Sequence, residues 1–275
     1  MIHTNLNNTI LQALLEVRIN YSEAKRDNAY FISNSLGMIT ITDVFLRSEE
    51  TDNLKEQIKK ILIESSSNKT NFKEAIDKIS QDGFFYEEDF YKYGNMHLKM
   101  LSEKCYIHIY QAFEVFLAEC FACLFWFFPL FMVKASVDIR DIFSNDNILT
   151  LRRNVIEQRV KETVQSNNIK NIILKFRDVF GVKISIPEDD LKSIIVISNN
   201  RHLLLHNQGI VNNSYMQNLK YEGIDSEYKI GDKILFNLKD QSQCSDQLDK
   251  AVDTIYDSIT SQIPQIENYL KSKLT

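Results

Sequence analysis

Glycine and proline are scarce in this chain. Its 275 residues contain 7 glycines and 3 prolines. Tight turns depend on these two residues, so a sandwich or barrel built from many short strands is disfavoured. The sequence therefore predicts a mainly helical protein, long enough for one large domain or two small ones.

The chain also lacks an excess of positive charge. Its formal net charge is -5 and its pI is near 5.6. A general nucleic-acid binder is basic over much of its surface, so this class is excluded. Any contact with nucleic acid has to come from a local basic patch.

Cysteine is rare, and no secretory signal pattern begins the chain. We therefore expect a reducing, cytoplasmic environment. Cys120 and Cys123 form C-x-x-C within an apolar run, but no second pair supplies the two further ligands of a zinc site. Buried structural thiols are expected for this pair; the other two cysteines are Cys105 and Cys244.

No apolar run reaches the length of a membrane span. The most apolar stretch, from Cys120 to Val133, is broken by Pro129. A spanning helix needs about 20 apolar residues, whereas a run of about 10–14 is typical of a core helix. We expect no membrane segment.

Apolar residues at spacings of three and four predict most of the helices. A short strand is expected at Met38–Thr42, and Pro264 is expected to kink the last helix. The predicted helices cover residues 5–28, 51–64, 70–80, 96–128 and 245–271.

One further helix has clear signals at both ends. Pro187 suits a first helical position, and the acids at 188–190 complement the positive end of the helix dipole. Gly209 is a typical residue just beyond a helix C-terminus. These signals predict a helix over residues 187–207. After it, a small β-hairpin is expected from Tyr228–Ile230 and Lys233–Leu238, around the turn residues Gly231-Asp232.

The end of this helix carries an unusual set of polar side chains. Arg201 and His206 are five residues apart, about 140° around a helix axis. His202 and His206 are four apart and share a face. Positive charge is favoured at a helix C-terminus, so capping explains part of this pattern.

The segment resembles the R-x(4–6)-H signature of the HEPN superfamily, in which a polar residue such as His202 follows the arginine. The resemblance implies an all-helical, usually dimeric bundle, and many members are metal-independent endoribonucleases. It covers residues 96–275, with the hairpin as an insertion at about 210–240. Residues 1–95 form an N-terminal helical extension of unknown function.

The resemblance also implies roles for individual residues. Arg201 and His206 would be catalytic, with His202 and Asn200 in support. Glu114 would pair with Arg201, although a position facing solvent at the helix edge is equally consistent with the sequence.

These residue types suit cleavage of RNA by its own 2′-hydroxyl. An imidazole donates or accepts a proton near neutral pH, and a guanidinium holds phosphate oxygens with a bidentate fork. One chain supplies one Arg201 and one His206, so a homodimer is expected to complete the site, without a cofactor.

One region is clearly basic. Residues 152–183 contain eight Lys or Arg against three acids. This excess is consistent with guiding a phosphate backbone, although such an excess is usually just a solvated helix face. The candidate RNA-binding residues are Arg152, Arg153, Arg159, Lys161, Lys170 and Lys175.

Three other interpretations stay open. His202 and His206 are suited to be half of a metal site, although no third ligand is evident. The fold is also consistent with an inactive HEPN-like dimerisation or nucleotide-binding module that serves another effector. The third interpretation is that the motif occurs by chance and the protein is a helical scaffold. For the active enzyme we expect a toxin or anti-phage defence role, held in check by an inhibitor, an antitoxin or another partner.

Overall fold

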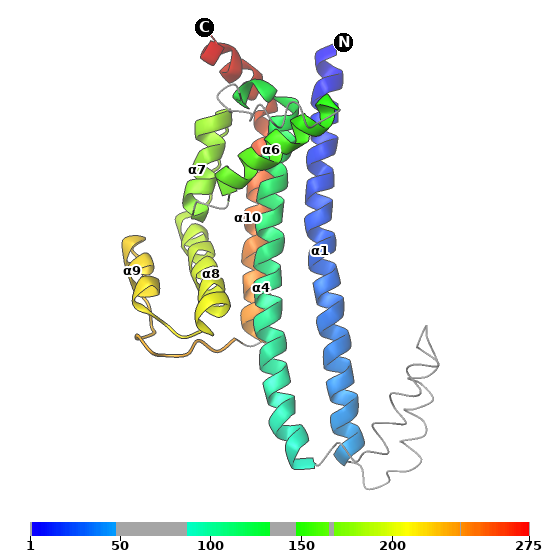
Figure 1. Cartoon of the computed structure of the whole chain (residues 1–275), viewed down its shortest axis with the longest axis vertical. Coiled ribbons are helices and arrows are strands. Elements are labelled where there is room, and N and C mark those ends of the chain that lie inside the picture. Colours follow the sequence, from blue (N-terminus) through cyan, green and yellow to red (C-terminus); the bar gives the residue numbers. More distant parts are fainter. Residues whose placement is uncertain (1, 48–86, 133–146, 165–167, 237, 275) are drawn as a thin grey trace, which may run out of the picture. The chain divides into compact units, whose positions relative to one another are not determined.

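The computed structural model describes residues 2–47, 87–132, 147–164, 168–236 and 238–274. These residues are 83% helical and contain no strand, which confirms the all-α prediction. The helices predicted at 51–64 and 70–80 lie outside them. The elements, shown in Figure 1, are α1 (Ile2–Arg47), α4 (Glu87–Phe127), the 3-10 helix η1 (Pro129–Met132), α6 (Ile148–Val164), α7 (Ile169–Phe180), α8 (Glu188–Asn207), α9 (Asn213–Tyr221) and α10 (Leu238–Leu274).

The chain forms two compact units. The larger consists of Met1–Asn28 and Glu103–Thr275, and the smaller of Ala29–Ser102. The described part of the smaller unit comprises residues 29–47 of α1 and residues 87–102 of α4. All residues proposed above for the candidate site belong to the larger unit.

The strand predicted at Met38–Thr42 is wrong, because α1 stays helical to Arg47. Isoleucine and threonine favour strands, but each costs a helix only a few tenths of a kcal/mol. Each further residue that stays helical adds one backbone hydrogen bond to the helix. The helix therefore continues through the β-branched residues.

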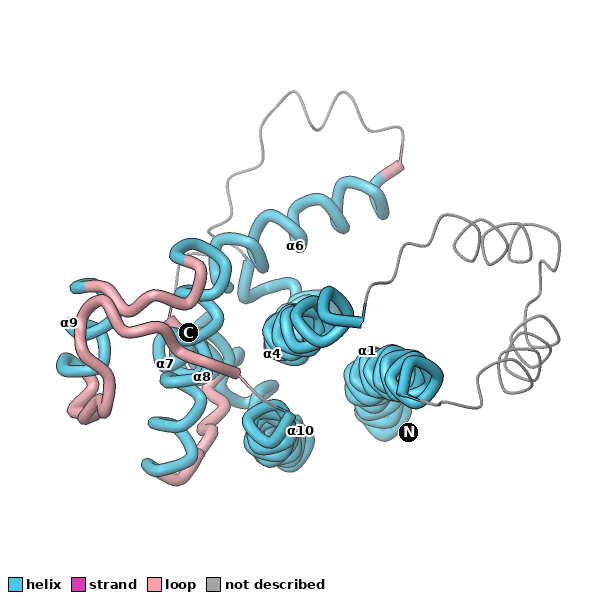
Figure 2. Tube along the Cα trace, turned by 90° about the horizontal axis from the view of Figure 1, so that it is seen from below, coloured by secondary structure: helices cyan, strands magenta, loops and turns pink. Residues whose placement is uncertain are grey.

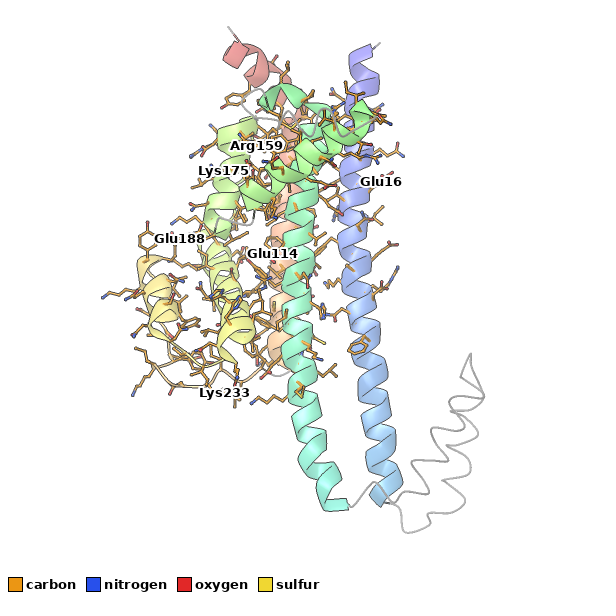
Figure 3. All side chains as sticks on the ribbon, viewed as in Figure 1. Glu16, Glu114, Arg159, Lys175, Glu188 and Lys233 are labelled. Atoms are coloured by element: carbon orange, nitrogen blue, oxygen red, sulfur yellow. The ribbon has the colours of Figure 1, made fainter. Side chains whose placement is uncertain are left out.

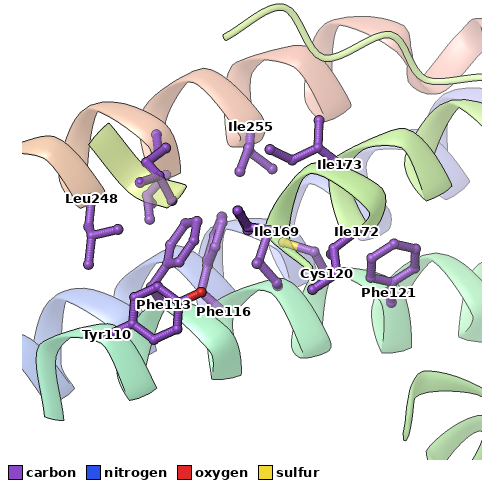
Figure 4. Close-up of a cluster of buried hydrophobic side chains, with 14 of the residues drawn as sticks. Tyr110, Phe113, Phe116, Cys120, Phe121, Ile169, Ile172, Ile173, Leu248 and Ile255 are labelled. Atoms are coloured by element: carbon purple, nitrogen blue, oxygen red, sulfur yellow. The ribbon is translucent and has the colours of Figure 1, made fainter. Parts of the chain in front are cut away.

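Aromatic side chains of α4 form the centre of the larger unit. Figure 4 shows them facing aliphatic side chains of α7 and α10. Phe121 stacks on Phe176 of α7 with ring centroids 4.0 Å apart, and its ring lies 5.9 Å from that of Phe180. All three rings are fully buried. Phe121 and Phe125, which belong to the most apolar stretch of the sequence, are therefore part of the core of this unit.

Part of the expected N-terminal extension packs into this core. Within the larger unit, Figures 1 and 2 show both α1 and α10 beside α4. Tyr21 of α1 lies 5.8 Å from the Phe116 ring, and its hydroxyl donates to Asp249 of α10 at 2.9 Å. Arg18 pairs with Asp253 at 2.7 Å. Residues 2–28 thus share one core with residues 103–274.

One described helix, Lys99–Phe127, is long and apolar enough to cross a membrane by length and composition. Half of its most apolar window is buried inside the protein. The core helix of a soluble protein passes the same test, so this feature is weak evidence for a membrane segment.

The segment after α8 differs from the expected hairpin. The residues described between 208 and 236 contain one isolated antiparallel bridge, between Ile210 and Lys233. Val211 donates to Asp232 at 2.8 Å and Ile234 donates to Gly209 at 2.9 Å. Residues 231–234 therefore pair with residues 209–211, whereas the bond from the Asp232 amide to the Lys229 carbonyl, at 3.0 Å, closes a turn. The hairpin is not confirmed.

Gly181 ends α7 in a left-handed conformation that a tyrosine ring covers. Its φ is 74°, and the amides of Gly181 and Val182 bond back to Arg177 and Phe176. A Cβ at this position would lie 2.7 Å from Cγ of Tyr269 on α10. Close approach of α7 and α10 therefore requires glycine here.

We predict that Gly181→Ala lowers the free energy of unfolding by about 2–4 kcal/mol, as left-handed strain adds to overpacking. Gly223→Ala is the matched control, because φ is also positive there but a Cβ meets no atom within 4 Å. It should cost only the strain, about 1 kcal/mol. Urea denaturation measures both, and equal losses would contradict the packing role of Tyr269.

Candidate functional site

Helix α8 carries the motif and is held on three sides. It contacts α7, α9 and α10, and it buries Ile194, Ile195, Ile197 and Leu203. The predicted span of 187–207 is confirmed to within one residue, since Pro187 is the N-cap and not the first helical position. Gln208 ends the helix in a left-handed conformation, and Gly209 follows with φ of 76°.

Arg201 and Glu114 form a bidentate ion pair between α8 and α4. Nη2 lies 2.9 Å from Oε2, and Nη1 donates to Oε1 at 3.2 Å. The side chains are 26% and 32% exposed. Figure 3 locates Glu114 on α4. The contact that the resemblance implied is confirmed.

Burial and the arginine act on Glu114 in opposite directions. Partial burial raises the pKa of Glu114, and the charge of Arg201 lowers it by less. Removing a carboxylate from water therefore costs more here than the ion pair returns. The glutamate is retained at some cost to stability, which is typical of groups that position another side chain.

Tyr110 also contacts Arg201, and the sequence analysis missed it. The guanidinium carbon lies 5.4 Å from the centroid of the tyrosine ring, within cation–π range. Tyr110 is buried, and burial raises its pKa to about 12, so it stays neutral. It lies four residues before Glu114, and this spacing was the available signal that both side chains face the same neighbour.

The two motif histidines are exposed and adjacent. Their ring centroids are 4.6 Å apart, as the four-residue spacing predicted. Burial, followed by the charges of His206 and Arg201, lowers the pKa of His202. His202 is therefore neutral at neutral pH.

Asn200 lies away from the histidines. It accepts from the Tyr215 hydroxyl at 2.9 Å, and its amide donates to the Tyr106 hydroxyl at 3.5 Å. Both tyrosines are buried. Asn200 therefore connects α8 to α4 and α9, and the structure does not bring it together with the other candidate residues.

An open cleft of about 1000 Å³ surrounds the ion pair. It lies among α4, α6, α7 and α8, and apolar side chains such as Val160 and Ile172 form part of its wall. Arg201 and His202 line it, whereas His206 does not. Its charged lining comprises Arg201 and Lys161 against the carboxylates of Glu114, Glu119 and Glu157.

Most of the candidate RNA-binding residues do not converge on this cleft. Of the six, only Lys161 is among the residues that line it. Arg159 pairs with Glu162 at 3.0 Å and Lys170 pairs with Glu222 at 2.8 Å. Figure 3 locates Arg159 on α6 and Lys175 on α7, and neither residue lines the cleft.

The guanidinium of Arg152 is engaged in contacts within the protein. It donates to the Trp126 carbonyl, and its guanidinium lies 4.3 Å from the centroid of a Trp126 ring. Arg153 is exposed. The basic stretch is thus partly neutralised or packed within the fold.

The cysteines are free thiols in the core, as was expected for Cys120 and Cys123. Cys105, Cys120 and Cys244 are buried, and Cys123 is partly buried. Burial raises the pKa of Cys123 to about 12, so its thiol stays protonated. In the described part of the chain, no three His, Cys, Asp or Glu side chains gather as a metal site.

Comparison with known proteins adds no family to this geometry. The chain matches no protein-family model, no curated protein and no solved structure. What supports a function is therefore the chemistry of Arg201, His206 and their neighbours.

We predict that the pKa of Glu114 lies above the ordinary glutamate value of 4.5 and that the pKa of Glu188 lies below it. The pKa of Glu114 is raised by burial, whereas that of exposed Glu188 is lowered by its hydrogen bond to Lys192. The stabilising contribution of Glu114 therefore falls as pH rises above 4.5, and that of Glu188 is lost as pH falls below 4.5.

Carboxyl carbon NMR titration measures both values, and Glu114→Gln and Glu188→Gln assign the two signals. A value for Glu114 at or below that of Glu188 would show that the cleft does not desolvate the ion pair.

Proposed function

We propose that the chain is a metal-independent endoribonuclease of the HEPN type, acting as a homodimer. The observation that carries this proposal is the position of Arg201. It is held by Glu114 and Tyr110 in an open cleft, five residues before an exposed His206 on the same helix.

The reaction is a transesterification within RNA. The 2′-oxygen attacks the adjacent phosphorus as its proton leaves to a base, and the bond from phosphorus to the 5′-oxygen breaks as that oxygen receives a proton. The products are a 2′,3′-cyclic phosphate and a 5′-hydroxyl. An imidazole side chain is suited to either proton transfer, and His206 would supply it.

Arg201 stabilises the charge that develops on the phosphate. A guanidinium has five N–H groups, and Glu114 takes two of them. Nε is buried and has no hydrogen-bond partner among the described residues. The second N–H groups of Nη1 and Nη2 therefore remain for phosphate oxygens, while the Glu114 carboxylate and the Tyr110 ring hold the guanidinium in place.

A second chain supplies the second imidazole. One His206 takes the proton of the 2′-hydroxyl and the other gives a proton to the leaving oxygen. His206 lies outside the cleft of its own chain, so a facing copy is a natural place for it to act. Leu205, which is 45% exposed beside His206, is an apolar contact for such a copy.

A ribonuclease of this kind needs control, since free activity would destroy the RNA of its own cell. We therefore propose a cytoplasmic toxin or abortive-infection effector against phage, kept inactive by an inhibitor, an antitoxin or another partner. The basic residues that remain exposed, such as Arg153, would contact RNA outside the cleft.

One observation favours the alternative of an inactive dimerisation or nucleotide-binding module. The cleft contains three carboxylates against Arg201 and Lys161, and this balance repels a polyanion. In that case the chain would dimerise, or bind a small ligand for another effector, without cleaving RNA.

We predict that purified protein cleaves RNA in the presence of EDTA and leaves cyclic phosphate ends. Arg201→Ala and His206→Ala should each lower the rate by about 10²-fold or more, because each removes a group that acts in the transition state. Gel analysis of labelled RNA measures both.

His108→Ala is the matched control, since His108 is exposed on α4 and does not line the cleft. It should retain full activity. Cleavage that survives both motif changes, or the absence of cleavage of any RNA tested, would reject the catalytic assignment.

We predict that the wild-type chain has twice its monomer mass of 32.1 kDa in solution and that Leu205→Asp makes it monomeric. The reason is that a charge at a buried dimer contact costs several kcal/mol. Light scattering during gel filtration measures the mass. Leu149→Asp, at an equally exposed leucine on α6, should leave it unchanged. A monomeric wild type would remove the shared site.

A further inference from the structure

His202 and His206 form a pair of imidazoles that the fold itself does not use. Both are exposed, and their ring centroids are 4.6 Å apart. Neither ring is hydrogen-bonded to the protein within the described ranges. Histidines four apart on a helix present their nitrogens on one face, which is the spacing that chelates a metal ion.

We infer that His202 and His206 form a bidentate site for a divalent, imidazole-seeking ion such as Zn²⁺, and that the bound ion blocks His206. Water would complete the coordination. The ion is an occluding ligand and not a cofactor. The inhibitory part of this inference rests on the proposed ribonuclease function, and the binding part does not.

The ring spacing fits such a chelate. With Zn–N bonds of about 2.0–2.1 Å, two imidazoles on a tetrahedral ion have centroids roughly 5 Å apart. The observed separation of 4.6 Å is close to this. Rotation of the two side chains is then sufficient, and the α8 backbone need not move.

The local charges also permit a cation. His206 lies in the last turn of α8, where the free carbonyl groups favour positive charge. Arg201 is the nearest cation along the helix, and its charge is balanced by Glu114. The ion pair that orients Arg201 therefore also lowers the repulsion that a metal would meet.

A bound ion would take the lone pair on which proton transfer depends. His206 could then neither accept a proton from the 2′-hydroxyl nor donate one to the leaving oxygen. Activity would be off while the ion is present and would return on chelation. This predicts an enzyme that EDTA activates or leaves unchanged, the reverse of a metal-dependent nuclease.

The test is calorimetric titration of the full chain, freed of metal, with ZnCl₂. We expect one ion per chain, and at least tenfold weaker binding for His202→Ala and for His206→Ala. His3→Ala and His108→Ala are matched controls that remove other histidines, and they should bind within twofold of the wild type. Circular dichroism checks that each variant keeps its helices.

Unchanged affinity in both motif variants, or an equal loss in His108→Ala, would overturn the site. An RNA cleavage assay with saturating Zn²⁺ separates the two proposals. Zinc binding by a chain that never cleaves RNA supports the site and rejects the ribonuclease. Cleavage that continues at saturating Zn²⁺ rejects the occlusion.

Discussion

The ion pair between Arg201 and Glu114 is the contact on which the candidate site depends. It joins two helices across 87 residues of sequence, and both partners are largely withdrawn from water. A guanidinium in this position without a carboxylate would be an uncompensated charge. The pair therefore links α8 to α4, and the cleft surrounds it.

The apolar core makes this polar contact possible. Stacked rings such as Phe121 and Phe176 hold α4 against α7, and the buried isoleucines of α8 hold the motif helix in place. Asn200 adds hydrogen bonds to two buried tyrosines, one on α4 and one on α9. Because α8 is held along its length, the side chains at its end occupy defined positions, as a catalytic constellation requires.

The charges around the pair limit what the cleft accepts. Three carboxylates line it with Arg201 and Lys161, so a long anionic strand would not lie along its floor. A single phosphate at Arg201, approached from the exposed side of α8 where His206 lies, is compatible with this distribution. The same exposed face carries the histidine pair proposed to bind a metal ion and the leucine proposed to meet a second chain. Substrate, ion and partner would then compete for, or share, one end of one helix.

Local signals were enough for several elements. Pro187 and Gly209 marked the ends of α8, and the spacing of aromatic residues identified α4 as a core helix. The pairing of Glu114 with Arg201 was implied by the family resemblance, whereas the sequence alone left a position facing solvent equally open. The strand predicted at Met38–Thr42 was wrong because the continuing helix outweighs β propensity there. The expected hairpin was not confirmed, because residues 231–234 bond to residues 209–211, which precede them by about 20 residues.

The sequence by itself determined the helical class, the ends of the motif helix and the spacing of Arg201, His202 and His206, because these depend on neighbours within a few turns. Only the tertiary structure decided that Tyr110 supports Arg201, that Arg152 packs on Trp126, and that His206 lies outside the cleft. Those outcomes depend on which helix faces are brought together, and burial of the whole core selects that arrangement.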